Sequence, residues 1–118
     1  MAISLTTLPQ INAYVAKVIS EAQHHAAPVA AVIPPLAAAV IARLNLAIDD
    51  VSIYQRNGKL ARTCWVTFGG TPSRRWVFSY NYAQQKIDLR QHSVQGPTVF
   101  QVDNSTSAAA IAAQVASL

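Results

Sequence analysis

The chain has 118 residues, of which 52% are hydrophobic and 12% are charged, and its formal net charge is +4. This length is close to the commonest domain size and the apolar content is far from that of disordered proteins, so we expect a single folded domain over residues 1–118. Cys64 is the only cysteine, which excludes an intramolecular disulfide. A reducing compartment is therefore favoured, and we predict a cytoplasmic protein.

An uncharged stretch over residues 26–42 is nearly long enough to cross a bilayer. Pro34 and Pro35 fall in its middle, and alanine contributes little transfer free energy, so a buried helix is favoured over a membrane span. The first ten residues lack the basic segment of a secretory signal. We predict a soluble protein without a membrane partner.

The first part of the chain predicts two helices within residues 7–48. Thr7 followed closely by Pro9 is typical of a helix start, since a proline in the first turn loses no hydrogen bond. Apolar residues then recur at spacings of three and four as far as His24 and His25, namely Leu8, Ile11, Val15, Val18, Ile19 and Ala22. We expect Pro35 to open the second helix, which continues through the apolar sequence LAAAVIARLNLAI.

An antiparallel β-meander of four or five strands is predicted over residues 51–102. Asn57 and Gly58 separate two alternating runs, and this dipeptide suits a type I′ turn because both central positions need a positive φ. A two-residue turn there pairs Arg56 with Lys59 and, further along, Val51 with Cys64. Later turns are expected at GGTPS and NYAQQ. The last strand, PTVFQV, leads to a C-terminal helix over residues 106–117.

Alternation gives the first hairpin two faces. One face is apolar apart from Arg62 and carries Val51, Ile53, Leu60, Cys64, Val66 and Phe68. The other carries Tyr54, Arg56, Lys59, Thr63, Trp65 and Thr67. On the next strand, three large rings favour the orientation in which Trp76, Phe78 and Tyr80 face the core, although the reverse stays open. The pattern predicts an α+β fold with the helices packed on one face of the sheet.

Residues 56–90 carry seven Lys or Arg residues against one acid, whereas the rest of the chain carries two against four. Such an asymmetry attracts phosphate-bearing partners, and arginine beside aromatic rings can stack on bases. The binding residues that we predict for a nucleic acid or another polyanion are Arg56, Lys59, Trp65, Arg74, Arg75 and Tyr54. Because strand neighbours alternate, only one of Arg74 and Arg75 can share a face with the others. These cations could equally serve to protect sheet edges.

Two other binding roles stay open. If Tyr54 and Trp65, with or without Val77, lie on the uncovered sheet face, they form an apolar patch with arginines around it, which suits a homodimer interface. Alternatively, the alanine-rich helices could leave a cavity for a small apolar ligand opposite the large rings of the sheet. Trp65 and Trp76 could also be ordinary core residues.

The sequence contains no catalytic, metal-binding or cofactor-binding motif that we can identify. Cys64 lies mid-strand on the apolar face, where a thiol is usually inert. His24 and His25 are neighbours that point about 100° apart on a helix, which makes them poor joint metal ligands. We predict a non-catalytic binding module of unknown function, with no cofactor and no metal. In its small size and its lack of a motif, the chain is similar to orphan proteins carried on bacterial mobile gene cassettes.

Overall fold

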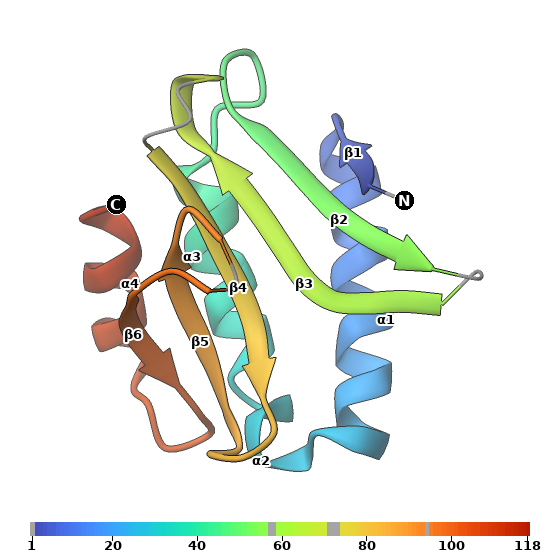
Figure 1. The fold of residues 1–118 in the computed structure, drawn as a ribbon, viewed down its shortest axis with the longest axis vertical. Helices are drawn as coiled ribbons and strands as arrows, with labels where there is room; N and C mark the ends of the chain where they lie inside the picture. The colour runs from blue at the N-terminus through green and yellow to red at the C-terminus, as the bar shows by residue number, and fades with distance from the viewer. Residues whose placement is uncertain (1, 57–58, 71–73, 94) are drawn as a thin grey trace.

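The computed structural model of the protein describes residues 2–56, 59–70, 74–93 and 95–118, and within them all side chains except those of residues 2, 25, 55, 56 and 59–62. A six-stranded antiparallel sheet is covered on one face by helices, which lie behind the sheet in Figure 1. The predicted α+β class is therefore confirmed. The helices and strands are β1 (Ala2–Leu5), α1 (Leu8–His25), α2 (Ala27–Ala30), α3 (Ile33–Arg43), β2 (Asp50–Arg56), β3 (Lys59–Thr67), β4 (Arg75–Asn81), β5 (Lys86–Gln91), β6 (Thr98–Val102) and α4 (Ala108–Ala116).

The sheet has one strand more than the four or five predicted. Its strands follow chain order from β1 to β6, and the additional strand is β1. In β1, Ile3 lies opposite Ile53 of β2, and Leu5 lies opposite Val51. Four residues are too few to display an alternating pattern, and the partner strand begins only after three helices. Tertiary pairing, rather than a local signal, determines this strand.

Helix α1 begins and ends where the sequence predicts. Thr7 is its N-cap, and the Thr7 hydroxyl accepts a hydrogen bond from the Gln10 backbone N–H at 3.3 Å. The Gln10 side chain in turn accepts hydrogen bonds from the backbone N–H groups of Thr6 and Thr7. This reciprocal capping box satisfies donors that the first helical turn would leave without partners.

The second predicted helix differs from α3 at both ends. Helix α3 begins at Ile33, so Pro34 and Pro35 both lie in its first turn, where proline is tolerated. It ends at Arg43 and does not continue to Ile48. The Asn45 side chain accepts a hydrogen bond from the Ala47 N–H at 3.1 Å, a local contact that competes with a helix.

Buried Asp49 fixes the connection that follows α3. One carboxylate oxygen accepts a hydrogen bond from the Asn45 N–H at 2.7 Å, and the other accepts one from the Gly69 N–H at 2.8 Å. Gly69 has a φ of 63°, a left-handed conformation that favours glycine. Asp49 therefore joins the α3–β2 connection to the end of β3.

The β2–β3 hairpin is confirmed at its end, where Arg56 pairs with Lys59, while the predicted Asn57–Gly58 turn lies outside the described residues. Beyond an irregularity between Ile53 and Gln55, Ile53 pairs with Cys64, so the predicted pairing of Val51 with Cys64 is wrong. The observed register differs from the predicted one by two residues, because between these paired positions β3 is longer than β2. Strand β3 bends visibly in Figure 1. An even shift preserves the faces of the strand.

The large rings of β4 face the helices, as predicted. Trp76 lies opposite Val66 of β3, and Phe78 lies opposite Cys64. The buried residues of the helical side form two clusters. One cluster joins α1, α2, α3 and α4 to β6 and contains Ala22, Ala26, Val29, Val32, Ile33, Leu36, Val102, Ile111 and Val115. The other lies at β1 and the start of α1 and contains Leu5, Ile11, Val51, Ile53, Val66 and Phe68.

Helix α4 is shorter than the predicted 106–117 segment because Ser107 is its N-cap, accepting a hydrogen bond from the Ala110 N–H at 3.1 Å. Ile111 and Val115 supply its buried face. Just before α4, the Asn104 side chain accepts a hydrogen bond from the Ala31 N–H at 2.9 Å and donates one to the Ala27 carbonyl at 2.8 Å. The segment leading into α4 is therefore attached to α2.

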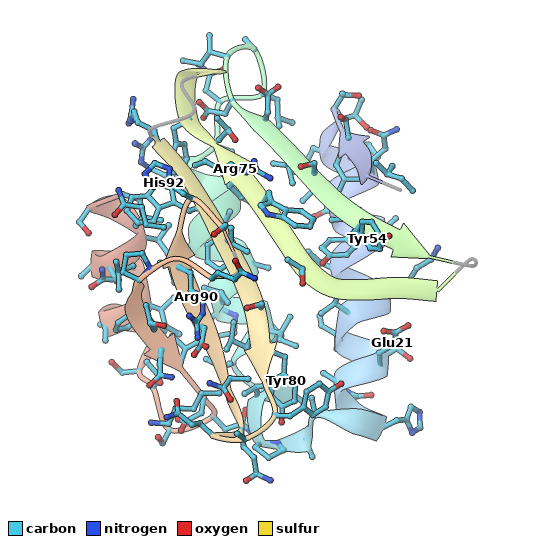
Figure 2. The ribbon with its side chains drawn as sticks, viewed as in Figure 1. Glu21, Tyr54, Arg75, Tyr80, Arg90 and His92 are labelled. Atoms are coloured by element: carbon cyan, nitrogen blue, oxygen red, sulfur yellow. The ribbon has the colours of Figure 1, made fainter. Side chains whose placement is uncertain are left out.

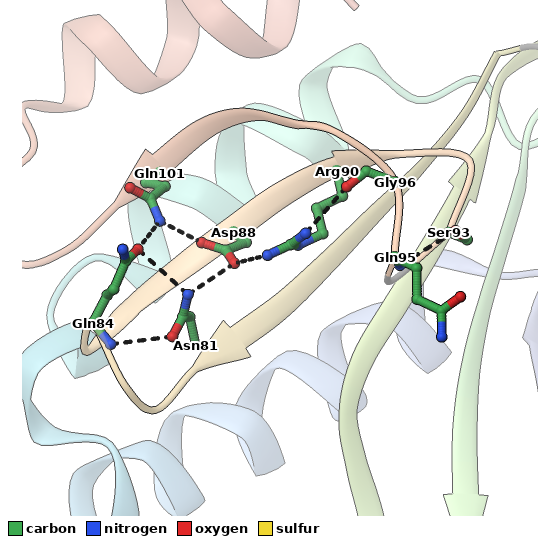
Figure 3. Close-up of polar contacts among 8 residues, drawn as sticks. All are labelled: Asn81, Gln84, Asp88, Arg90, Ser93, Gln95, Gly96 and Gln101. Atoms are coloured by element: carbon green, nitrogen blue, oxygen red, sulfur yellow. Dashed lines mark hydrogen bonds and ion pairs between the residues drawn. The ribbon is translucent and has the colours of Figure 1, made fainter.

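On the face of the sheet away from the helices, Asp88 is the centre of a polar network (Figure 3). One carboxylate oxygen accepts a hydrogen bond from Gln101 at 2.7 Å. The other accepts hydrogen bonds from Arg90 at 2.9 Å and from Asn81 at 3.2 Å. The Asp88 side chain is 2% exposed and that of Arg90 is 26% exposed, so water screens this ion pair only weakly.

The β5–β6 connection completes this part of the outer face. Arg90 donates a second hydrogen bond to the Gly96 carbonyl at 3.1 Å. A Cβ atom at position 96 would lie 1.8 Å from the Gln91 carbonyl oxygen, so the backbone approach requires glycine. Between Trp65 and Arg90 on neighbouring strands, Val77 is 0% exposed. The outer face is therefore partly closed by its own side chains and connections.

We predict that Asp88→Asn lowers the free energy of unfolding at pH 7 by about 1.5–3 kcal/mol, because it removes hydrogen bonds to a charged group. Burial acts to raise the pKa of Asp88, but the hydrogen bonds from Gln101, Arg90 and Asn81 and the charge of Arg90 together hold the pKa below its usual range. The stabilisation is therefore complete above about pH 4 and is lost as the pH falls through the folded-state pKa.

Urea unfolding at pH 7 and pH 3 checks this prediction. The loss of stability between the two pH values should be smaller in Asp88→Asn than in the wild type. Asp50→Asn, at an exposed acid, is the control and should behave as the wild type does. Equal acid sensitivity of the wild type and Asp88→Asn would contradict the role assigned to Asp88.

Candidate functional site

A cavity of about 170 Å³ lies between the helices and the sheet. Residues of both core clusters line it, so it occupies the space where the two clusters do not close against each other. The lining is mainly apolar and includes Val18, Ala22, Leu36, Ala37, Val66 and Phe78. Among the described residues, the helices contribute Ala22, Ala26 and Ala37 to the lining together with larger apolar side chains, and the small volume of these alanines leaves space in the core.

The few polar side chains of the cavity lining come from α1 and from β3 and β4. Tyr14 and Glu21 lie seven residues apart on α1 and hence on one side of the helix. Tyr80 lies near the end of β4, and Figure 2 shows it in the same lower part of the molecule as Glu21. Both Glu21 and Tyr80 are half-buried, so solvent reaches this side of the cavity.

Burial determines the protonation of the two weak acids in the lining. It raises the pKa of the Tyr14 hydroxyl far above its ordinary value, with smaller contributions from Cys64 and then from Glu21. It also raises the pKa of the Cys64 thiol to about 12. At neutral pH both groups keep their protons, so Tyr14 can donate a hydrogen bond and Cys64 lacks the thiolate of a nucleophile.

Of the residues predicted to bind a polyanion, the structure brings together Trp65 and Arg75. Both lie on the outer face, and the Arg75 guanidinium carbon is 5.6 Å from the centre of the Trp65 ring. Arg74 belongs elsewhere, because its guanidinium lies over the ring of Phe68, a core residue that also carries Arg43 at 4.3 Å. Arg75, labelled in Figure 2, is thus the one of the two adjacent arginines that shares the face of Trp65.

The other three predicted residues lie along the β2–β3 hairpin. Tyr54 is 38% exposed, and it adjoins the irregular part of the hairpin. Arg56 and Lys59 pair at the hairpin end, and their side chains lie outside the described residues. Lys59 and Thr67 are the two ends of β3, and Thr67 pairs with Arg75. Along an extended strand, Lys59 and Arg75 would therefore lie up to about 26 Å apart.

No sequence motif marks Tyr14 or Glu21, and alternation along β4 predicts Tyr80 only as a core ring. A signal was present in α1, where Glu21 directly precedes buried Ala22 at the border of the apolar stripe. A charged residue at such a border can face the interior of a protein. The cavity itself has no sequence signal, because its volume depends on how closely the helices approach the sheet.

Within the described ranges, the side chains of His, Cys, Asp and Glu form no group of three or more that could hold a metal ion. The described helices also include none with the length and apolar character needed to cross a membrane. A cytoplasmic location stays a prediction from the sequence.

Comparison with known protein families gives a match over residues 11–112, from α1 into α4. The matching family is described as Integron cassette protein VCH_CASS1 chain, a description that names no activity. No curated protein matches the chain. The family match agrees with the resemblance to mobile cassette proteins, and it covers most of the 118 residues. The chain therefore belongs to this integron cassette protein family.

Proposed function

We propose that this protein binds a small apolar ligand in the cavity between α1, α3 and the sheet. The observation that carries the proposal is the cavity of about 170 Å³ with its mainly apolar lining. An engineered apolar cavity of roughly 150 Å³ is known to bind benzene, so a space of this size suits a ligand with one ring or a short hydrocarbon chain. No described feature points to catalysis on such a ligand, and the proposed role is binding.

The apolar surface of the cavity supports the proposal. Apolar surface that stays in contact with water costs about 25 cal/mol per Å² relative to the same surface in contact with apolar atoms. A ligand that restores the missing contacts recovers part of that free energy. Larger side chains at alanine positions such as Ala22 or Ala37 would remove the cavity, so the small residues at these positions favour a space that is kept for a ligand.

The outer sheet face is a second candidate site, for a nucleic acid or another polyanion. The observation that favours it is the guanidinium of Arg75 above the ring of Trp65, a combination that can stack on a base and contact a phosphate. The same surface is where we would place a homodimer interface. Val77 is fully buried, so the apolar patch there consists of exposed Tyr54 and half-buried Trp65.

We expect Ala37→Leu to fill part of the cavity and to weaken ligand binding. With toluene as the probe, amide shifts in an NMR titration should saturate in the wild type and concentrate at cavity-lining residues such as Val66 and Phe78. In Ala37→Leu the shifts should largely disappear, while the free energy of unfolding rises by about 0.5–2 kcal/mol. Ala38→Leu makes the same change at an exposed position of α3 and should leave toluene binding intact. Absence of saturable shifts in the wild type would refute the proposal.

Arg75→Gln tests the outer face. Fluorescence anisotropy with a labelled single-stranded oligonucleotide at two salt concentrations should show binding that weakens in the variant. If Arg75 contacts a phosphate, the slope of log K against log salt should also become less steep by about 0.7. Lys17→Gln removes the same charge from an exposed position on α1 and is the matched control. Equal affinities of the two variants would remove the support for a site at Arg75.

A further inference from the structure

Glu21 is the one charged side chain among the described residues that line the cavity. It is also the only glutamate of the chain, and it is half-buried. Within the described part of the structure, it makes no hydrogen bond or ion pair. Because this side chain is half-buried, its carboxylate lies where the apolar lining of the cavity meets solvent.

The buried acids of the protein differ from Glu21 in this respect. Asp49 accepts hydrogen bonds from two backbone N–H groups, and Asp88 accepts them from three side chains. Their carboxylates are satisfied within the fold. Glu21 is less buried than these two acids, so its carboxylate is open to solvent and to a ligand that enters the cavity.

The polar groups near Glu21 favour a positively charged ligand. Glu21 lies close enough to Tyr14 to contribute to the raised pKa of that hydroxyl, although burial and Cys64 contribute more. The aromatic ring of Tyr80 also lines the cavity and is fixed edge-on by Tyr82, with ring centres 4.6 Å apart. Ammonium groups are attracted to aromatic faces as well as to carboxylates. No described lysine or arginine lines the cavity and could occupy this place.

We infer that the ligand of this cavity is a small organic amine, whose apolar ring or short chain fills the cavity while its ammonium group pairs with Glu21 beside Tyr80. The inference rests on the proposed function and specifies the class of ligand. Lys17, one turn before Glu21 on α1, is exposed and does not line the cavity, so the Glu21 carboxylate is the charge that an entering ligand meets there.

Three probes of similar size separate the contribution of charge from that of apolar burial, namely 2-phenylethylamine, 2-phenylethanol and 3-phenylpropionate. In NMR titrations of the full chain at pH 7, the amine should bind at least about tenfold more tightly than the alcohol, as expected for a hydrogen-bonded charge pair. The carboxylate probe should bind most weakly, because Glu21 repels it.

Glu21→Gln keeps the size of the side chain and removes its charge. In this variant the advantage of the amine over the alcohol should disappear, while the affinity for the alcohol stays within about twofold, which also shows that the cavity is intact. Asp50→Asn removes one negative charge at an exposed position away from the cavity lining and should keep the preference for the amine.

The outcomes separate the two proposals. If toluene and the alcohol bind but the amine binds no more tightly, the inference about the amine is overturned and the cavity remains a ligand site. The inference is also overturned if Glu21→Gln keeps the amine preference. If none of the probes binds the wild type, the proposed function fails, and the inference fails with it.

Discussion

The alternation of side chains along β3 and β4 determines which part of this protein is core, which is cavity and which is surface. It places Val66, Trp76 and Phe78 toward the helices and Trp65 and Val77 toward the other face. Opposite Ile53 and Gln55, β3 is two residues longer than β2. This even shift of register leaves each side chain of β3 on the same face of the sheet. A shift of one residue would have turned the apolar face of β3 toward solvent.

The helical side meets this face with side chains of unequal size. The cluster near β1 contains leucine, isoleucine, valine and phenylalanine, and the cluster near α4 contains mainly valine, isoleucine and alanine. The helical lining of the cavity includes Ala22, Ala26 and Ala37 among larger apolar residues, and the layers do not close there. The cavity therefore follows from where the large residues are placed along the chain, and membership of an integron cassette family adds no named activity to that geometry.

Local signals were sufficient for much of the fold. The cap at Thr7, the hairpin end at Arg56 and Lys59 and the inward rings of β4 all rest on contacts between residues near one another in sequence or on simple alternation. Strand β1 and the end of α3 could not be predicted in this way. The first depends on pairing with a distant strand, and the connection that follows the second is held by Asp49, whose partner Gly69 lies 20 residues away.

The candidate sites show the same division. Alternation predicted that only one of Arg74 and Arg75 shares the face of Trp65, and that residue is Arg75. Lys59 and Arg75 belong to one basic stretch of the sequence, but they lie near opposite ends of β3. Glu21 and Tyr80, which both line the cavity, come from α1 and β4 and are separated by about half the chain, so nothing in the local sequence relates them.

Strand β1 and helix α1 connect the edge of the sheet to one wall of the cavity as a single segment. β1 is an edge strand of four residues, and it continues through a two-residue connection into α1, which forms one wall of the cavity. The meander from β2 to β6 is joined by short connections and does not depend on this segment for its internal pairing. The pairing of Ile3 with Ile53 and of Leu5 with Val51 at the sheet edge therefore also holds the cavity wall formed by α1 in place.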